Sequence, residues 1–228
     1  LDLVNDIFHR DVAGKDLLEG LLKLLNTIKE TQKFPKIFSY ADISSIYKGK
    51  GDKTDLNNDR GIFCLTIFRT IFDKLLYNDT YEKIDVNLTD SNVGARKSRN
   101  IRDNLFVLNA VMNLAAQNKT NPIDIQVYDV TKCFDKLWLH KTLNDMYETN
   151  VQDATINLLY EENKKSYVTI KTPYGKTSQM EIDEIVMQGS VWGPIQCTTS
   201  MDKLGTLAYK SGKALYTYKN KVKIPPLG

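Results

Sequence analysis

Two acids stand six residues apart where an alternating stretch of the chain ends. Asp129 closes residues 123–129, in which apolar and polar side chains alternate, and Asp135 follows shortly after. The alternation predicts a half-buried strand. A carboxylate at the end of a strand can hold Mg²⁺, which prefers hard oxygen ligands and takes others from substrate phosphates. The same position is typical of a turn or helix-cap residue, so Asp129 by itself leaves both interpretations open.

A second chemical signal is basic. Residues 96–102 hold four cations in seven positions with no acid, and residues 203–228 contain lysines as their only charged residues. The four cations are Arg96, Lys97, Arg99 and Arg102. On a chain of net charge +3, such clusters suit a partner with repeated phosphates, because each contact releases condensed counterions. The alternative is a solvated basic loop.

Composition limits the class of protein. With 228 residues, 42% of them hydrophobic and 26% charged, the chain can bury a core as one large domain or two intimate lobes. No stretch approaches the roughly 20 apolar residues that a membrane-spanning helix needs. The cysteines are odd in number and form no CxxC pair, which favours a reducing compartment, argues against a structural zinc site and predicts core thiols. They are Cys64, Cys133 and Cys197.

The elements that must position these residues follow from periodicity and turn signals. Helical patterns cover residues 16–30, 66–83, 104–118, 139–147 and 153–164. Strand patterns cover residues 41–47, 123–129, 166–172, 177–182 and 214–218, and a glycine-bearing loop at 188–194 opens one more helix. This order predicts an α+β fold, with a helix-rich first lobe and a boundary near residue 120.

Several segments together resemble a known family. Their order along the chain is similar to that in the reverse transcriptases of non-LTR (LINE-like) retrotransposons, over about residues 34–203. The segments are IYKGKGD at 46–52, NDRGI at 58–62, NVGARKSR at 92–99, DVTKCFD at 129–135 and QGSVWGP at 188–194.

The resemblance implies a fold and an activity. The fold is the fingers and palm of a right-hand polymerase, with a ferredoxin-like antiparallel palm sheet. Residues 1–45 become an N-terminal helical extension, residues 46–120 the fingers, and residues 121–228 an incomplete palm without a thumb. The activity is that of an RNA-directed DNA polymerase, which extends a DNA primer on an RNA template with dNTPs and two Mg²⁺ ions.

The resemblance also assigns roles to residues. Lys48 and Arg60 contact the incoming triphosphate, and the Phe134 ring lies beneath the sugar, where it excludes a 2′-hydroxyl. Gln188 and Gly189 face the templating pair or the incoming base, and Asp129 becomes the catalytic metal ligand. The alternatives without a functional role are solvated surface cations for Lys48 and Arg60, a core residue for Phe134, and an ordinary loop at the start of a helix for Gln188 and Gly189.

One element of the family pattern is not found in the sequence. No two aspartates are adjacent anywhere in the 228 residues, so we expect the acidic turn to follow Gly228 and the chain alone to be inactive as a polymerase. A domesticated nucleic-acid-binding protein is the first rival, and an RNA-directed RNA polymerase is the second, which Phe134 and the Gln188–Gly189 pair disfavour. For the parent element we expect an intracellular protein of cytoplasm and nucleus, since no secretory signal is visible.

Overall fold

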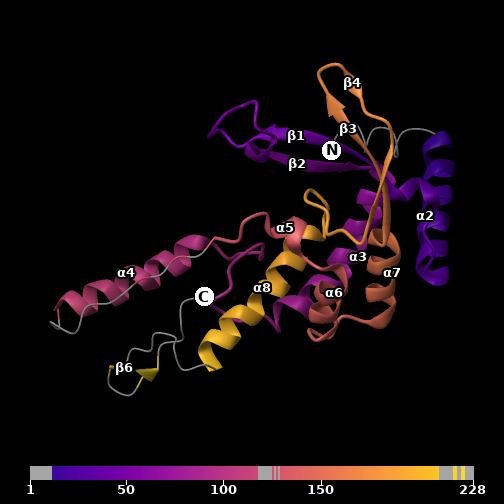
Figure 1. Ribbon diagram of the computed structural model, residues 1–228. Helices are drawn as coiled ribbons and strands as arrows, with labels where there is room; N and C mark the ends of the chain where they lie inside the picture. Colours follow the sequence, from indigo (N-terminus) through magenta and orange to yellow (C-terminus); the bar gives the residue numbers. More distant parts are fainter. Residues whose placement is uncertain are drawn as a thin grey trace.

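A computed structural model describes residues 12–117, 125, 127, 129–210, 218–219 and 222–223. The architecture is mixed α/β. A five-stranded sheet stands beside a group of packed helices, and helix α4 extends away from both (Figure 1). This agrees with the predicted α+β class, although the predicted boundary near residue 120 lies outside the described residues.

The sheet combines strands from distant parts of the sequence. Its order is β2-β1-β3-β4, and β5 also pairs with β3. The strands are β1 (Tyr40–Tyr47), β2 (Asp59–Leu65), β3 (Lys165–Thr172), β4 (Gly175–Lys176) and β5 (Met180–Asp183). β3 pairs antiparallel with β4 and β5, whereas β1 and β3 run parallel, with Tyr40 opposite Tyr167, so the sheet is mixed. Alternation of apolar and polar residues predicts that a segment forms a strand. It does not predict which strand lies beside it, because that depends on packing between segments joined by a long connection.

The helices agree closely with the predicted ranges. They are α2 (Val12–Thr31), α3 (Ile67–Asp85), α4 (Ile101–Gln117), α5 (Cys133–Lys136), α6 (Leu139–Tyr147), α7 (Asp153–Asn163) and α8 (Gly193–Lys210). Short elements complete the description: η1 (Lys36–Ser39), η2 (Leu56–Asn58), β6 (Tyr218–Lys219) and β7 (Val222–Lys223). Of the strand predicted at 214–218, residues 214–217 lie outside the described part of the chain.

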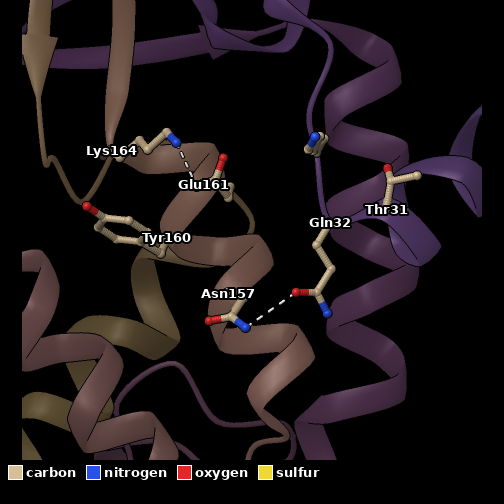
Figure 2. A pocket seen from close by; sticks show the side chains of 7 residues that line it. Thr31, Gln32, Asn157, Tyr160, Glu161 and Lys164 are labelled. Atoms are coloured by element: carbon tan, nitrogen blue, oxygen red, sulfur yellow. Dashed lines mark hydrogen bonds and ion pairs between the residues drawn. The ribbon is translucent and has the colours of Figure 1, made fainter.

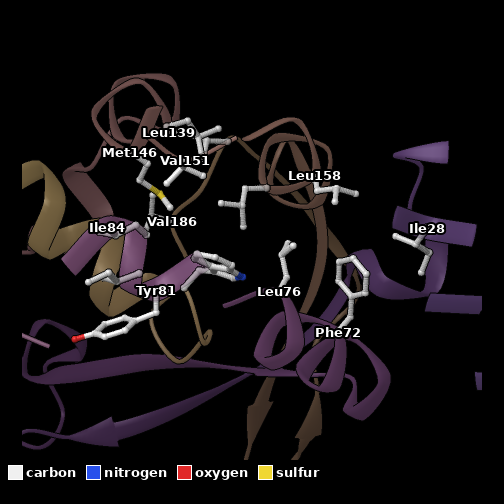
Figure 3. Packing of buried hydrophobic residues seen from close by; sticks show 14 of the residues in the cluster. Ile28, Phe72, Leu76, Tyr81, Ile84, Leu139, Met146, Val151, Leu158 and Val186 are labelled. Carbon is white, nitrogen blue, oxygen red and sulfur yellow. The ribbon is translucent and has the colours of Figure 1, made fainter. Parts of the chain in front are cut away.

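The main hydrophobic core lies among the helices. Ile28 of α2, Leu76 of α3 and Leu158 of α7 are buried in one cluster, which Figure 3 shows together with side chains from α6. Trp192, just before α8, is also fully buried there. The leucine stripe of α2 divides: Leu21 and Leu25 join the core, while the remaining leucines of the helix stay exposed.

The buried side chain of Arg69 connects helices α3 and α7 of the core. Arg69 of α3 is paired with Glu162 of α7, and it donates to the Phe38 carbonyl (3.0 Å) and to Asn163 Oδ1 (3.3 Å). Asp73 lies one helical turn further along α3, where burial and the neighbouring Glu162 raise its pKa well above the usual value. Because an unpaired charge would be costly at this depth, the network fixes how α3 meets α7.

Two predictions about burial are wrong. Residues 123, 124, 126 and 128 of the strand predicted at 123–129 lie outside the described residues, but Ile125 and Val127, which the pattern predicted to be half-buried, are exposed, Val127 to 89%. Within the described part of the chain, strands β1 to β5 pair only with one another, so no neighbouring strand covers Ile125 or Val127. The expectation of three core thiols is also wrong, because Cys64 is exposed and Cys133 and Cys197 are half-buried.

Candidate nucleotide and nucleic-acid site

The glycine-bearing loop at residues 187–193 is attached to the free edge of β2. The Phe63 N–H donates to the Gln188 carbonyl at 2.8 Å. Gly189 has φ +108, and a Cβ there would lie 2.9 Å from the Phe63 carbonyl oxygen and 3.0 Å from Ile62 Cγ2. Glycine is therefore required at this position for its backbone angle and for its close approach to the strand. The loop leads into α8, as predicted.

The same loop contacts the segment that follows Asp129. A Cβ at Gly193 would lie 3.3 Å from Phe134 Cε1 and 2.5 Å from the Met187 carbonyl oxygen. Phe134 is half-buried on α5, at the edge of the main core. The structure thus brings Phe134 and the loop of Gln188 and Gly189 together. It also gives Phe134 core contacts, so both interpretations of this residue retain support.

The two predicted triphosphate cations share one face of the β1–β2 hairpin. Arg60 stands opposite Ile46, and the Lys48 N–H continues the ladder by donating to the Asn58 carbonyl at 2.8 Å. Side chains two apart along a strand point to the same side, so Lys48 and Arg60 lie on one face with Ile62. Arg60 is exposed, and no hydrogen bond or ion pair holds its guanidinium among the residues that the structure describes.

Sequence reasoning missed Lys132. Its Nζ donates to Asn57 Oδ1 at 3.0 Å, while Lys48 Nζ donates to the Asn57 carbonyl at 2.6 Å. Asn57 therefore joins the hairpin turn to the segment three residues after Asp129. Lys132 also adopts a left-handed conformation (φ 53, ψ 50), which costs a non-glycine residue on the order of 1 kcal/mol. No local sequence signal marks that backbone angle in a lysine.

Asp129 itself lies exposed and outside regular secondary structure. A carboxylate is the hard oxygen ligand that Mg²⁺ prefers, so its chemistry fits this ion. It offers only one such group. Across the described residues, no three or more His, Cys, Asp or Glu side chains gather in a way that could hold a metal ion.

Arg96 is not available for phosphate. Its side chain is buried, its Nε donates to Asp85 Oδ1 at 2.8 Å, and its Nη1 donates to the carbonyls of Thr89 (2.7 Å) and Asn92 (2.9 Å). Hydrogen bonding to Arg96 lowers the pKa of Asp85, and the same contact raises that of the arginine. The prediction that Arg96 contacts nucleic acid rested on the lack of nearby acids in sequence, and this premise is wrong in three dimensions.

The other three cations of residues 96–102 remain at the surface. Arg99 pairs with Asp90 at 2.8 Å, and both side chains are exposed. Lys97 Nζ lies 4.4 Å from the ring centroid of Tyr81, a cation–π contact. Arg102 is exposed in the first turn of α4. These three cations stay available, in part, to an anionic partner.

The loop before these cations is fixed to α8. Thr198 Oγ1 donates to the Gly94 carbonyl at 2.8 Å, and Asn92 Nδ2 donates to the Thr198 carbonyl at 3.1 Å. Helix α8 therefore contacts both the loop before these cations and, through Gly193 in its first turn, Phe134. The rigidity of α8 sets the spacing between the two regions.

A hollow of about 440 Å³ lies elsewhere, between the end of α2 and α7. Figure 2 shows Gln32 and Asn157 joined across it, with Asn157 Nδ2 at 3.3 Å from Gln32 Oε1. None of the predicted site residues belongs to its lining. The candidate site is thus a surface between the hairpin, α5 and the 187–193 loop.

Comparison with models of known protein families gives no match, and no curated protein sequence matches the chain significantly. Within the described residues, no helix is both long enough and apolar enough to cross a membrane.

Proposed function

We propose that the chain is the fingers and part of the palm of a reverse transcriptase that extends a DNA primer on an RNA template with dNTPs. The resemblance of its ordered segments to non-LTR retrotransposon enzymes suggests this activity. The supporting observation is spatial: three segments distant in sequence meet at one surface. They are the hairpin that carries Lys48 and Arg60, the turn that carries Phe134, and the loop of Gln188 and Gly189.

Each group has a role that its chemistry can perform. Lys48 and Lys132 supply point charges and Arg60 a forked guanidinium for phosphate oxygens. Asn57 holds the two lysine side chains near one another, which lowers the entropy lost when an anion binds. The Phe134 ring excludes a 2′-hydroxyl from the sugar, and Gly189 holds its loop close against β2, the strand that carries Arg60. These contacts position the reactants, and positioning is the main source of catalysis in phosphoryl transfer.

Asp129 is the residue of this chain that would hold Mg²⁺. When bound, the ions stabilise the attacking and leaving oxygens of the phosphoryl transfer. In a chain that also carries an adjacent pair of aspartates, Asp129→Asn keeps the shape and removes the charge, so it should abolish primer extension while RNA affinity stays unchanged. Full extension by that variant would contradict the role.

Nucleotide affinity tests the triphosphate contacts in the chain itself. We expect Lys48→Ala and Arg60→Ala each to weaken binding of a labelled dNTP, measured with template–primer and Mg²⁺ present, by about tenfold. Lys74→Ala is the matched control, because Lys74 is exposed on α3, away from the hairpin. Equal losses in all three variants would mean a general charge effect and would remove the assignment.

Sugar selectivity tests Phe134. Phe134→Ala should raise the affinity for ribonucleotides relative to deoxynucleotides and leave template binding nearly intact. Phe106→Ala is the control, because Phe106 is an exposed phenylalanine of α4. An unchanged ratio would return Phe134 to a core role, and a parent protein that prefers ribonucleotides would favour an RNA-directed RNA polymerase. RNA binding without any nucleotide binding would favour the domesticated nucleic-acid-binding protein.

A further inference from the structure

Two thiols that are distant in sequence meet beside the candidate site. Cys133 of α5 and Cys197 of α8 are separated by 64 positions, yet their Sγ atoms lie 3.3 Å apart. Both residues are half-buried, so a small oxidant can reach the pair. The third cysteine, Cys64, is exposed on β2, where its Sγ lies 3.6 Å from Ser44 Oγ.

We propose that Cys133 and Cys197 form an oxidisable dithiol, a modification site whose co-reactant is a low-molecular-weight disulfide such as oxidised glutathione. The proposal does not rest on the polymerase function, because it follows from the sulfur positions alone. A disulfide needs an S–S separation of about 2.05 Å, so the two sulfurs have to approach by little more than an ångström. Rotation of the two side chains and a small shift of the short α5 helix can supply that movement.

The order of the two steps follows from the environments of the sulfurs. Burial and the adjacent Cys133 raise the pKa of Cys197 to about 12, so Cys197 stays protonated at neutral pH and is the poorer nucleophile. The Cys133 thiolate therefore attacks one sulfur of oxidised glutathione and displaces a glutathione thiolate. Cys197 then loses its proton to solvent and attacks the Cys133 sulfur, which releases the second glutathione. Two thiols are oxidised, and one disulfide is reduced to two thiols.

The bond would join the two elements that support the candidate site. Phe134 is the residue after Cys133, and Gly193, which contacts the Phe134 ring, lies one turn before Cys197 on α8. Oxidation would therefore fix the turn that follows Asp129 against α8. It would also close a long loop, which restricts the unfolded chain.

The test is a thiol titration of the 228-residue chain carrying Cys64→Ser, which leaves only the pair. In glutathione buffers of graded ratio, we expect the folded protein to lose both thiols together and to retain no glutathione. The folded pair should oxidise at an oxidised-to-reduced glutathione ratio at least about tenfold lower than the same chain in urea, because folding holds the sulfurs together. Equal or harder oxidation of the folded chain would overturn the proposal.

Single variants identify the partners and the order of attack. Cys197→Ala should retain one glutathione on Cys133, measured by intact mass, whereas Cys133→Ala should react at least about tenfold more slowly at Cys197. Mapping of the disulfide-linked peptides in the Cys64→Ser protein gives a readout that does not depend on how either variant folds. A linkage between separate molecules in place of the 133–197 bond would refute the site.

Discussion

The chain has two basic regions whose cations differ in what they contact. In residues 96–102, Arg96 is buried, and Asp85 and backbone carbonyls take up its donors. In the β1–β2 hairpin and the adjoining turn, Lys48 and Lys132 stay near the surface and share Asn57, a neutral residue. The sequence makes the first region look more basic. In the structure, two of the four cations of the first region pair with acids, whereas Lys48 and Lys132 of the second contact only a neutral residue among those described.

The two regions differ because folding brings acids from other parts of the chain next to the first region. Asp85 ends α3, eleven positions before Arg96, and the intervening turns fold the chain so that their side chains meet. A run of cations in sequence therefore does not measure the charge offered to a partner. Burial and the position of acids on neighbouring elements decide it. Four predictions test this contrast.

Truncation of Arg96 should give the largest effect. Arg96→Ala removes the ion pair of Asp85 and leaves the carbonyls of Thr89 and Asn92 without the donor that Arg96 supplies, so we expect a loss of about 2–4 kcal/mol in the free energy of unfolding. Urea denaturation measures this loss. Arg102→Ala is the control, because that side chain is exposed, and it should change stability by less than about 0.5 kcal/mol. Equal effects of the two variants would erase the contrast.

Replacement of Lys132 should weaken nucleotide binding without a loss of stability. Lys132→Gly relieves the left-handed backbone, so the protein should be equally stable or up to about 1 kcal/mol more stable. The same change removes a cation from the hairpin surface and should weaken dNTP binding about tenfold, or about 1.4 kcal/mol. Lys136→Gly, at the end of α5, removes a cation without relieving strain. A loss of stability in Lys132→Gly with unchanged affinity would assign Lys132 a structural role.

These residues also mark what could be predicted from sequence. The amphipathic helices α2 and α6 were predictable because their periodicity reflects local geometry and one buried face. The parallel pairing of β1 with β3 was not, because it depends on packing between segments far apart in the chain. For the site, the family resemblance grouped Phe134 with the loop of Gln188 and Gly189, and the structure places Phe134 against Gly193 at the end of that loop. Motif order contained no information on the backbone angle of Lys132.

The pairing of Asp85 with Arg96 should make stability depend on pH. Hydrogen bonding to Arg96 is the largest cause of the lowered pKa of Asp85, and a donation from Tyr81 adds to it. A carboxyl group whose pKa is lower in the folded than in the unfolded protein stabilises the fold at pH values above its unfolded pKa, which is 3.8 here. This stabilisation is lost as the pH falls through the folded pKa. Asp85→Asn should therefore cost about 1 kcal/mol at pH 7, and the cost should shrink below about pH 4.

Urea unfolding at several pH values measures this prediction. Asp79→Asn is the control, because Asp79 is exposed on the same helix, and its effect should be small at every pH. Asp73 has a raised pKa, so its contribution to stability has the opposite pH dependence and weakens as pH rises. Because both proteins being compared keep Asp73, its contribution cancels in the difference between wild type and Asp85→Asn. A cost that stays constant down to pH 3 would show that Asp85 acts through shape alone.

The smallest expected effect concerns Arg99, which stands between the two kinds of cation. Its pair with Asp90 is exposed on both sides, so it should contribute less than about 0.5 kcal/mol to stability. Removal of the acid frees the guanidinium, and Asp90→Asn should therefore raise RNA affinity about twofold, while Arg99→Ala lowers it by a similar factor. The double variant should bind RNA as weakly as Arg99→Ala does, because the acid then has no arginine to restrain. Filter binding at two salt concentrations measures the effect, which should diminish at the higher one since exposed charges are screened. If Asp90→Asn gained equally with and without Arg99, the gain would come from net charge, and Arg99 would belong with Arg96 among the cations that serve only the fold.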